Sequence, residues 1–213
     1  MSWRDDFLLD LARYRRPKKG RETAPSVRRD LWLVLRSPSL CALLDYRLGR
    51  GLAHAPLPAR LKRLTAHALG GPRAVIQTIS GIHIPVEADI GAGLYIPHHG
   101  GIWVNRETVM GRNCLISQGV TIGVSGSNEQ RGVPHMGDHV YIGPNAVVAG
   151  KIKLGDGAFV AANSLVLRDV PAGALARGVP AEIVPRASGE GADVTSSSGG
   201  SSAGTTAVSE PDD

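Results

Sequence analysis

The chain has 213 residues, 42% hydrophobic but only 4% aromatic, enough to bury the core of one domain or two small ones. Its formal net charge of +5 is uneven, because residues 1–75 hold 16 of the 24 Lys and Arg but only 6 of the 19 Asp and Glu. The two cysteines, Cys41 and Cys114, exclude a disulfide framework and a cysteine-based metal site.

The basic N-terminal part is open to several interpretations. Such a region contacts nucleic acid, a membrane surface or an anionic partner, or simply carries solvated helix faces. Few aromatic residues accompany the charges, so nucleic-acid binding is not expected, while peripheral membrane contact stays an open alternative. No signal-peptide pattern opens the chain, and Arg36 and Pro38 break its longest apolar run, so we expect a cytoplasmic protein without a membrane span.

Residues 1–79 are expected to form an all-helical N-terminal domain. Apolar residues at helical spacing predict helices over 3–16, 26–35, 39–52 and 59–69. The Gly-Gly-Pro sequence at 70–72 is expected to end the last of them. The pattern does not decide whether this domain packs on itself, pairs with another subunit or lies on a membrane.

Residues 80–187 are expected to form a second domain, and residues 84–171 within it repeat with a period of six, which neither a helix nor a flat strand produces. A coil that turns a corner every six residues does, with three corners making a turn of 18 residues around an aliphatic column. A small or β-branched residue often follows four positions later, where space at the corner is short. The recurring aliphatic residues are Ile84, Ile90, Ile96, Val104, Met110, Ile116, Ile122, Met136, Ile142, Val148, Leu154, Val160 and Val166.

Two breaks interrupt this period. The interval from Ile96 to Val104 is eight residues, and the interval from Ile122 to Met136 is fourteen. The second break inserts a polar loop, SGSNEQRGVP. A regular coil does not need this loop, and loops on rigid scaffolds commonly carry sites. Pro171 and Pro180 are expected to stop the coil. The Gly/Ser/Thr-rich tail over 188–213 is expected to be disordered.

His98 is the first candidate for chemistry. It lies in IPHHGG beside the first break, and an imidazole accepts a proton near neutral pH. The glycines that follow would let a ligand approach the backbone closely. The alternative is an exposed corner histidine without a role. His83, His135 and His139 are weaker candidates, and no His, Cys or Asp cluster has the spacing of a metal site, so no metal is expected.

Residues 81–186 resemble the hexapeptide-repeat acyltransferases, and within them the branch similar to serine O-acetyltransferases. The resemblance rests on the segments IGAGLYIPHHGGIWV, MGRNCLISQGVTIGVSG, RGVPHMGDHVYIGPNAVVAG and LGDGAFVAANSLVLRDVPAGALARGVPAEIV. It implies a mainly β fold, a left-handed parallel β-helix preceded by the helical domain. It further implies a homotrimer or a dimer of trimers, active sites between subunits, and acetyl-CoA as donor.

The resemblance places the family's catalytic histidine on His98, as general base toward an acceptor hydroxyl. The family's CoA contacts fall on Gly123, Gly143, Ala161, Ala162 and, less directly, on Arg168. Where related enzymes end in Pro-Ala-Arg, this chain has Pro-Ala-Glu at 180–182, so one basic contact is replaced.

Departures from the serine-specific pattern affect the acceptor. An aspartate normally precedes the histidine, where this chain has Pro97, and a second aspartate lies where it has His83. The Arg-His-Pro after the inserted loop is Gly-Val-Pro here, with Arg131 one residue away. His83 and Arg131 are therefore the acceptor-binding candidates, without the carboxylates that would pair a serine ammonium group.

These departures favour an acetyl-CoA-dependent O-acetyltransferase acting on a saccharide or another non-serine alcohol. One alternative is a serine O-acetyltransferase with a remodelled acceptor pocket. Another, from a different class, is a non-catalytic trimeric β-helix scaffold.

Overall fold

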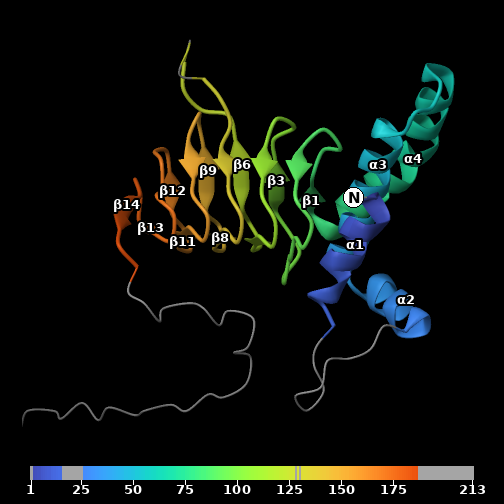
Figure 1. Cartoon of the computed structure of the whole chain (residues 1–213), viewed down its shortest axis with the longest axis horizontal. Helices are drawn as coiled ribbons and strands as arrows, with labels where there is room; N and C mark the ends of the chain where they lie inside the picture. The colour runs from blue at the N-terminus through green and yellow to red at the C-terminus, as the bar shows by residue number, and fades with distance from the viewer. Residues whose placement is uncertain (1, 16–25, 128, 130, 187–213) are drawn as a thin grey trace, which may run out of the picture.

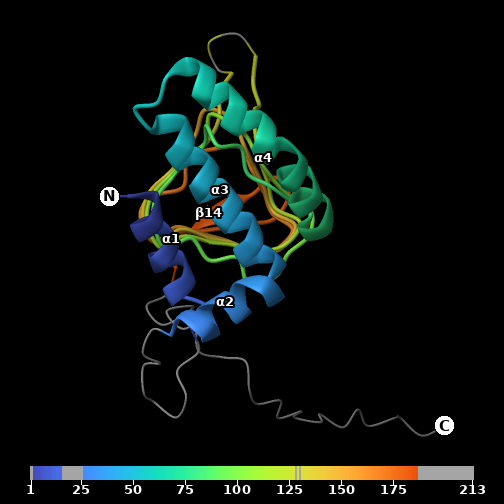
Figure 2. The same ribbon diagram turned by 90° about the vertical axis from the view of Figure 1, so that its right-hand side faces the viewer.

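The computed structural model describes residues 2–15, 26–127, 129 and 131–186. It consists of helices packed against one end of a three-sided coil of short strands (Figure 1). The helices are α1 (Trp3–Ala12), α2 (Val27–Arg36), α3 (Pro38–His54) and α4 (Ala59–Ser80). Viewed from the helical end, they lie across the mouth of the coil (Figure 2). The tail over 188–213 lies outside the described residues.

The last helix is longer than the sequence predicts. Helix α4 passes through the Gly-Gly-Pro sequence at 70–72 and ends at Gly81, whose φ of 62° closes it in the left-handed conformation. Pro72 and the preceding turn are exposed, so water can serve the carbonyl that a proline leaves unpaired. An ion pair from Arg73 to Asp45 of α3, 2.9 Å long, holds the second half in place. Helix α1 ends at Ala12 rather than near residue 16.

The coil is built from three sheets. The first contains β1 (Ile82–His83), β3 (Ile102–Val104), β6 (Thr121–Gly123), β9 (Val147–Ala149) and β12 (Leu165–Val166). The second contains β2 (Asp89–Ile90), β4 (Val109–Met110), β7 (His135–Met136) and β10 (Lys153–Leu154). The third contains β5 (Leu115–Ile116), β8 (Tyr141–Ile142), β11 (Phe159–Val160), β13 (Leu175–Arg177) and β14 (Glu182–Val184).

The predicted aliphatic column is confirmed. All thirteen recurring aliphatic side chains are buried, none more than 6% exposed. The small residues that follow them, such as Cys114, Ala146 and Ala158, are buried as well. Each turn therefore adds its inward side chains to one continuous core, and burial of this apolar surface drives the stacking.

Strand register locates both breaks. Trp103 pairs with Thr121, 18 residues on, as a regular turn requires. The sequence separation of the partners Ile82 and Ile102 is two residues longer than a regular turn, and that of Thr121 and Val147 is eight residues longer. Both excesses leave the coil as loops, so the strands above and below remain aligned. The longer loop is the yellow excursion between β6 and β7 (Figure 1).

The coil does not stop at Pro171. Val170 still bridges Leu154, β13 continues the parallel third sheet, and β14 then turns back antiparallel to it. Pro171 lies in a turn after the last bridge of the second sheet, and no strand of that sheet in the described residues lies beyond it to need the missing donor.

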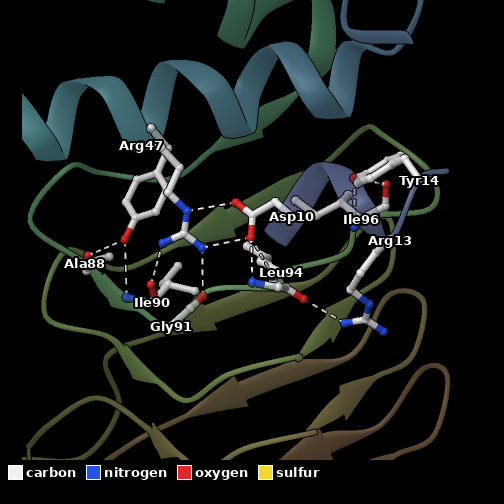
Figure 3. A network of polar contacts seen from close by, with 11 residues as sticks. Asp10, Arg13, Tyr14, Arg47, Ala88, Ile90, Gly91, Leu94 and Ile96 are labelled. Atoms are coloured by element: carbon white, nitrogen blue, oxygen red, sulfur yellow. Dashed lines mark hydrogen bonds and ion pairs between the residues drawn. The ribbon is translucent and has the colours of Figure 1, made fainter. Parts of the chain in front are cut away.

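The helices complete the hydrogen bonding of the first turn, which has no preceding turn to pair with (Figure 3). Buried Arg47 of α3 donates to the carbonyls of Ile90 and Gly91 and pairs with Asp10 of α1. Asp10 accepts from the N–H groups of Gly93 and Leu94, each at 2.8 Å. The hydroxyls of Tyr14 and Tyr46 act similarly. Each donates to one backbone carbonyl of the first turn and accepts from one of its N–H groups. No helix in the described ranges is long and apolar enough to cross a bilayer.

Candidate active site

His98 lies at the bend formed by the two extra residues. Tyr95 still bridges Leu115 in the third sheet, and β3 begins at Ile102 in the first, so the excess falls between them. The imidazole is exposed, and Gly100 and Gly101 follow with φ of 110° and 66°. These left-handed conformations favour glycine. The bend therefore presents the His98 side chain away from the core.

Stacking also requires glycine at this corner. A Cβ on Gly81 would lie 3.0 Å from the Cα of Gly100, and one on Gly101 would lie 3.3 Å from the Cα of Gly119. The same corner continues through Asn145 and Asn163, which also have positive φ. We call this column, which joins the third sheet to the first, the histidine edge.

The other candidate residues fall into two groups. Gly143, Ala161 and Ala162 follow β8 and β11, so they lie on the histidine edge with His98. Gly123 ends β6, and Arg131 and Arg168 follow strands of the first sheet, so the three lie at the next corner, which we call the loop edge.

The two edges lie at opposite ends of the parallel strands of the first sheet. His98 comes before β3, whereas the inserted loop leaves after β6, and β3 and β6 are adjacent and parallel. One chain therefore does not bring His98 and Arg131 together. A site that uses both needs two copies of the chain.

His83 lies on the outer face of the first sheet, between the edges. Its ring stacks on Trp103, with centroids 3.8 Å apart and planes at 11°. The two residues are register partners in β1 and β3. Within the described residues His83 makes no hydrogen bond to His98. An aromatic platform thus stands where the serine-specific pattern has a carboxylate.

The inserted loop is closed at its base. Ser125 and Gly132 pair as an antiparallel bridge with two backbone hydrogen bonds of 3.2 Å. Arg131, beside this bridge, is exposed. Arg168 is also exposed, on the last full turn. The remaining histidines considered above do not join His98: His135 lies in β7 on the second sheet, and His139 occupies a turn with φ of 57°.

Gly143 has a packing role that the sequence did not reveal. A Cβ there would lie 2.7 Å from the Ala162 nitrogen and 2.8 Å from the Val160 carbonyl oxygen. The close approach of successive turns therefore requires glycine at this position whether or not a ligand binds.

Sequence reasoning missed two residues next to the bend. The Tyr14 hydroxyl donates to the Ile96 carbonyl at 2.9 Å and accepts from the Ile96 N–H at 3.0 Å, two residues before His98. Burial raises the pKa of Tyr14 well above its ordinary value, so the hydroxyl stays protonated. Gln118, 18 residues after Gly100, has a buried amide oxygen with no partner among the described residues. Counting turns from Gly100 would have located Gln118, but no sequence signal linked Tyr14 to Ile96.

No three His, Cys, Asp or Glu side chains gather as potential metal ligands in the part of the chain that the structure describes.

The sequence that forms the three-sided coil also matches a family of hexapeptide-repeat transferases. Residues 134–168 match the family described as bacterial transferase hexapeptide (six repeats). The serine acetyltransferase of Helicobacter pylori strain J99 is 36% identical over 162 residues, covering 76% of this chain and 90% of that protein. The chain belongs to the serine acetyltransferase family of hexapeptide-repeat acyltransferases.

Two further comparisons agree. The serine acetyltransferase of Synechococcus elongatus is 32% identical over 165 residues, and the match spans 78% of this chain but 64% of that protein. Soybean serine acetyltransferase complexed with serine superposes with a TM-score of 0.69 at 32% identity, covering 86% of this chain and 70% of that one. Neither comparison supports the saccharide acceptor that the sequence departures favoured.

Proposed function

We propose that the protein is an acetyl-CoA-dependent O-acetyltransferase in which His98 is the general base and L-serine is the acceptor. The proposal rests above all on one observation. The exposed imidazole stands on a bend that continues through two glycines, where the sequence resemblance places the family's catalytic histidine. Family membership supports a serine acceptor over a saccharide, and a cytoplasmic location is part of the same proposal.

The chemistry follows from an exposed imidazole beside a thioester. His98 takes the proton from the acceptor hydroxyl as its oxygen attacks the acetyl carbonyl. The new C–O bond forms, the C–S bond breaks, and the imidazolium returns the proton to the CoA thiolate. General acid–base help of this kind is worth roughly 10²–10⁴ in rate. Backbone N–H groups near the edge are candidates to stabilise the oxyanion.

The site is proposed to form between two copies of the chain in a homotrimer, within the left-handed coil that the resemblance implies. The separation of the histidine and loop edges supports this, because Arg131 and His98 can meet only across an interface. Outward side chains also support it. The first sheet exposes Trp103, and the third presents Tyr141 stacked on Phe159 at 4.1 Å. A dimer of trimers is not required by this argument.

Acetyl-CoA is proposed to lie along the histidine edge. Ala161 and Ala162 leave this edge free of bulky side chains near Gly143, and Ala162 is exposed. Arg168, from the loop edge of a neighbouring copy, is the candidate for a CoA phosphate. The unpaired Gln118 oxygen is a candidate acceptor for a donor group of the bound substrate, since an unpaired buried oxygen costs about 1–3 kcal/mol.

One observation favours a second candidate, transfer to an alcohol that is not an amino acid. The His83–Trp103 stack offers a flat aromatic surface and no carboxylate for an ammonium group. Without a carboxylate at this position a zwitterionic acceptor loses a charge-assisted partner, whereas an uncharged alcohol does not.

Release of CoA thiol from acetyl-CoA tests both candidates, with L-serine in one series and sugars and nucleotide sugars in another. His98→Ala should lower turnover by roughly 10²–10⁴. His99→Ala is the matched control, because His99 is the exposed neighbour and should leave turnover nearly unchanged. Turnover on sugars alone would replace serine by the second candidate. Absence of both turnover and CoA binding would leave a non-catalytic scaffold.

A further inference from the structure

Helix α2 turns an apolar face to solvent. Val27, Leu31 and Leu35 are 85%, 58% and 72% exposed, and Trp32 beside them is 55% exposed. Residues four apart lie on one face of a helix, so the three aliphatic side chains form a row along α2. Among the residues that the structure describes, this row is left largely uncovered.

The side of α2 next to this row accounts for the attachment of the helix. Val34 is 9% exposed, and Leu33 packs against the core. Asp30 accepts from Arg15 at 3.1 and 2.8 Å, and Cys41 of α3 donates through sulfur to the Val34 carbonyl. Figures 1 and 2 show α2 at the margin of the helical layer. The helix is thus anchored by one side and leaves its apolar row available.

Positive charges accompany the apolar row. Arg28 and Arg36 are exposed on α2, and the Arg36 guanidinium lies 4.5 Å from the centre of the Trp32 ring. The only acidic residue of the helix, Asp30, is engaged by Arg15. Across residues 13–36 the sequence holds nine Lys and Arg against two Asp and Glu. Arg28 and Arg36 therefore add positive charge beside the row, with no exposed carboxylate on α2 to offset it.

We propose that α2 docks this face onto an anionic lipid surface, lying in the plane of the membrane. Val27, Leu31, Leu35 and Trp32 enter the boundary between headgroups and acyl chains, while Arg28 and Arg36 contact the headgroups. Helices with an apolar face that includes Trp and Leu, and with basic residues beside it, bind membranes in this way. Each cation near such a surface raises partitioning about fivefold.

A second copy of the chain is the competing occupant, and charge disfavours it. Pairing two α2 faces would bring Arg28 and Arg36 of one copy next to the same residues of the other. Asp30 cannot relieve this repulsion, because its carboxylate faces Arg15 on the anchored side. An anionic surface instead complements the charges. The membrane proposal does not depend on the acetyl-transfer proposal.

Flotation of the full-length protein with lipid vesicles tests the proposal. Vesicles of phosphatidylcholine with added phosphatidylglycerol should carry the protein upward, and vesicles of phosphatidylcholine alone should carry much less. Leu31→Gln combined with Leu35→Gln should lower the bound fraction at least tenfold. Arg28→Gln combined with Arg36→Gln should lower it about fivefold per charge on anionic vesicles only.

The matched control is Leu61→Gln combined with Leu64→Gln on α4. These leucines are 41% and 66% exposed, so the control removes similar apolar surface from another helix. It should float like the unmodified protein, and all variants should show unchanged circular dichroism because their side chains are exposed.

Two outcomes overturn the proposal. One is failure to float with anionic vesicles. The other is flotation that the α2 variants leave unchanged while sedimentation shows that they lower the oligomeric mass, which would assign the face to a second copy. A variant with Trp3→Phe and Trp103→Phe, retaining Trp32, should give blue-shifted fluorescence only with anionic vesicles if the proposal holds.

Discussion

Asp10 and Arg47 form an ion pair of 2.8 Å at the junction of helices and coil, with side chains 0% and 2% exposed. The pair comes from α1 and α3, and both partners also bind backbone groups of the first turn. Both charges of the pair are therefore hydrogen bonded, as burial of an ion pair requires.

Removing one partner should be costly. Arg47→Met leaves the Asp10 carboxylate buried without its cation and frees two first-turn carbonyls, so we expect a loss of about 3–5 kcal/mol in the free energy of unfolding. Urea unfolding followed by circular dichroism measures this loss. Arg106→Ala is the control, because the pair of Arg106 with Glu87 is 65% and 51% exposed and should contribute little. Equal effects of the two substitutions would contradict the role given to the buried pair.

Tyr14 is expected to position the bend that carries His98. Tyr14→Phe leaves both backbone groups of Ile96 without their partner, so stability should fall by about 1–3 kcal/mol and the bend should lose a fixed point. The kcat with the acceptor that the unmodified protein acetylates should fall about tenfold, while KM for acetyl-CoA should change little.

Tyr46→Phe is the matched control for this effect. The Tyr46 hydroxyl donates to the Ala88 carbonyl at 2.7 Å, which also accepts from Arg50, and accepts from the Ile90 N–H at 3.2 Å, a similar arrangement one corner earlier. It should lose comparable stability but keep its kcat. If both variants lost turnover equally, Tyr14 would be structural only.

Two glycines should respond in opposite directions to alanine. Gly143→Ala forces a methyl group against the next turn and should destabilise the protein by about 1–3 kcal/mol. Gly70→Ala adds a methyl group inside α4 where nothing lies within 4 Å, so it should stabilise by about 0.5–1 kcal/mol. Thermal unfolding reports both shifts. A stabilising Gly143→Ala would mean that the turns approach less closely than described.

Cys114 should be unreactive in the folded protein. Burial raises the pKa of its thiol to about 12, so almost no thiolate exists at mildly alkaline pH. In a Cys41→Ser background, an aromatic disulfide reagent should modify no thiol in native buffer and one in denaturant. Rapid modification in native buffer would show that the coil opens at Cys114.

The coil was predictable because the side chains that point into its core recur every six residues, and each recurring aliphatic residue is buried. The end of α4 was not predictable, because α4 continues through Pro72, where water can reach the carbonyl that the proline leaves unpaired. Nor was the continuation past Pro171, which depends on the proline falling in a turn rather than in a ladder.

The candidate site was only partly predictable. Spacing marked His98 and the inserted loop as irregular, but a period of six does not say which corner carries which break. The separation of His98 from Arg131 emerged only from strand register. Asp10 and Arg47 looked like ordinary solvated helix charges, since nothing in a single sequence distinguishes them from Asp6 or Arg50.

Stacked turns make the coil a nearly one-dimensional assembly, in which each turn is held by its immediate neighbours. The bend with His98 belongs to the first turn of the coil. This turn has another turn on one side only, and the helices lie on its other side. Fraying at that end would disorder His83 and His98 before the other candidate residues, while Ala161 and Ala162 would keep strands on both sides. The contacts of α1 and α3 with the first turn therefore determine how well His98 stays ordered.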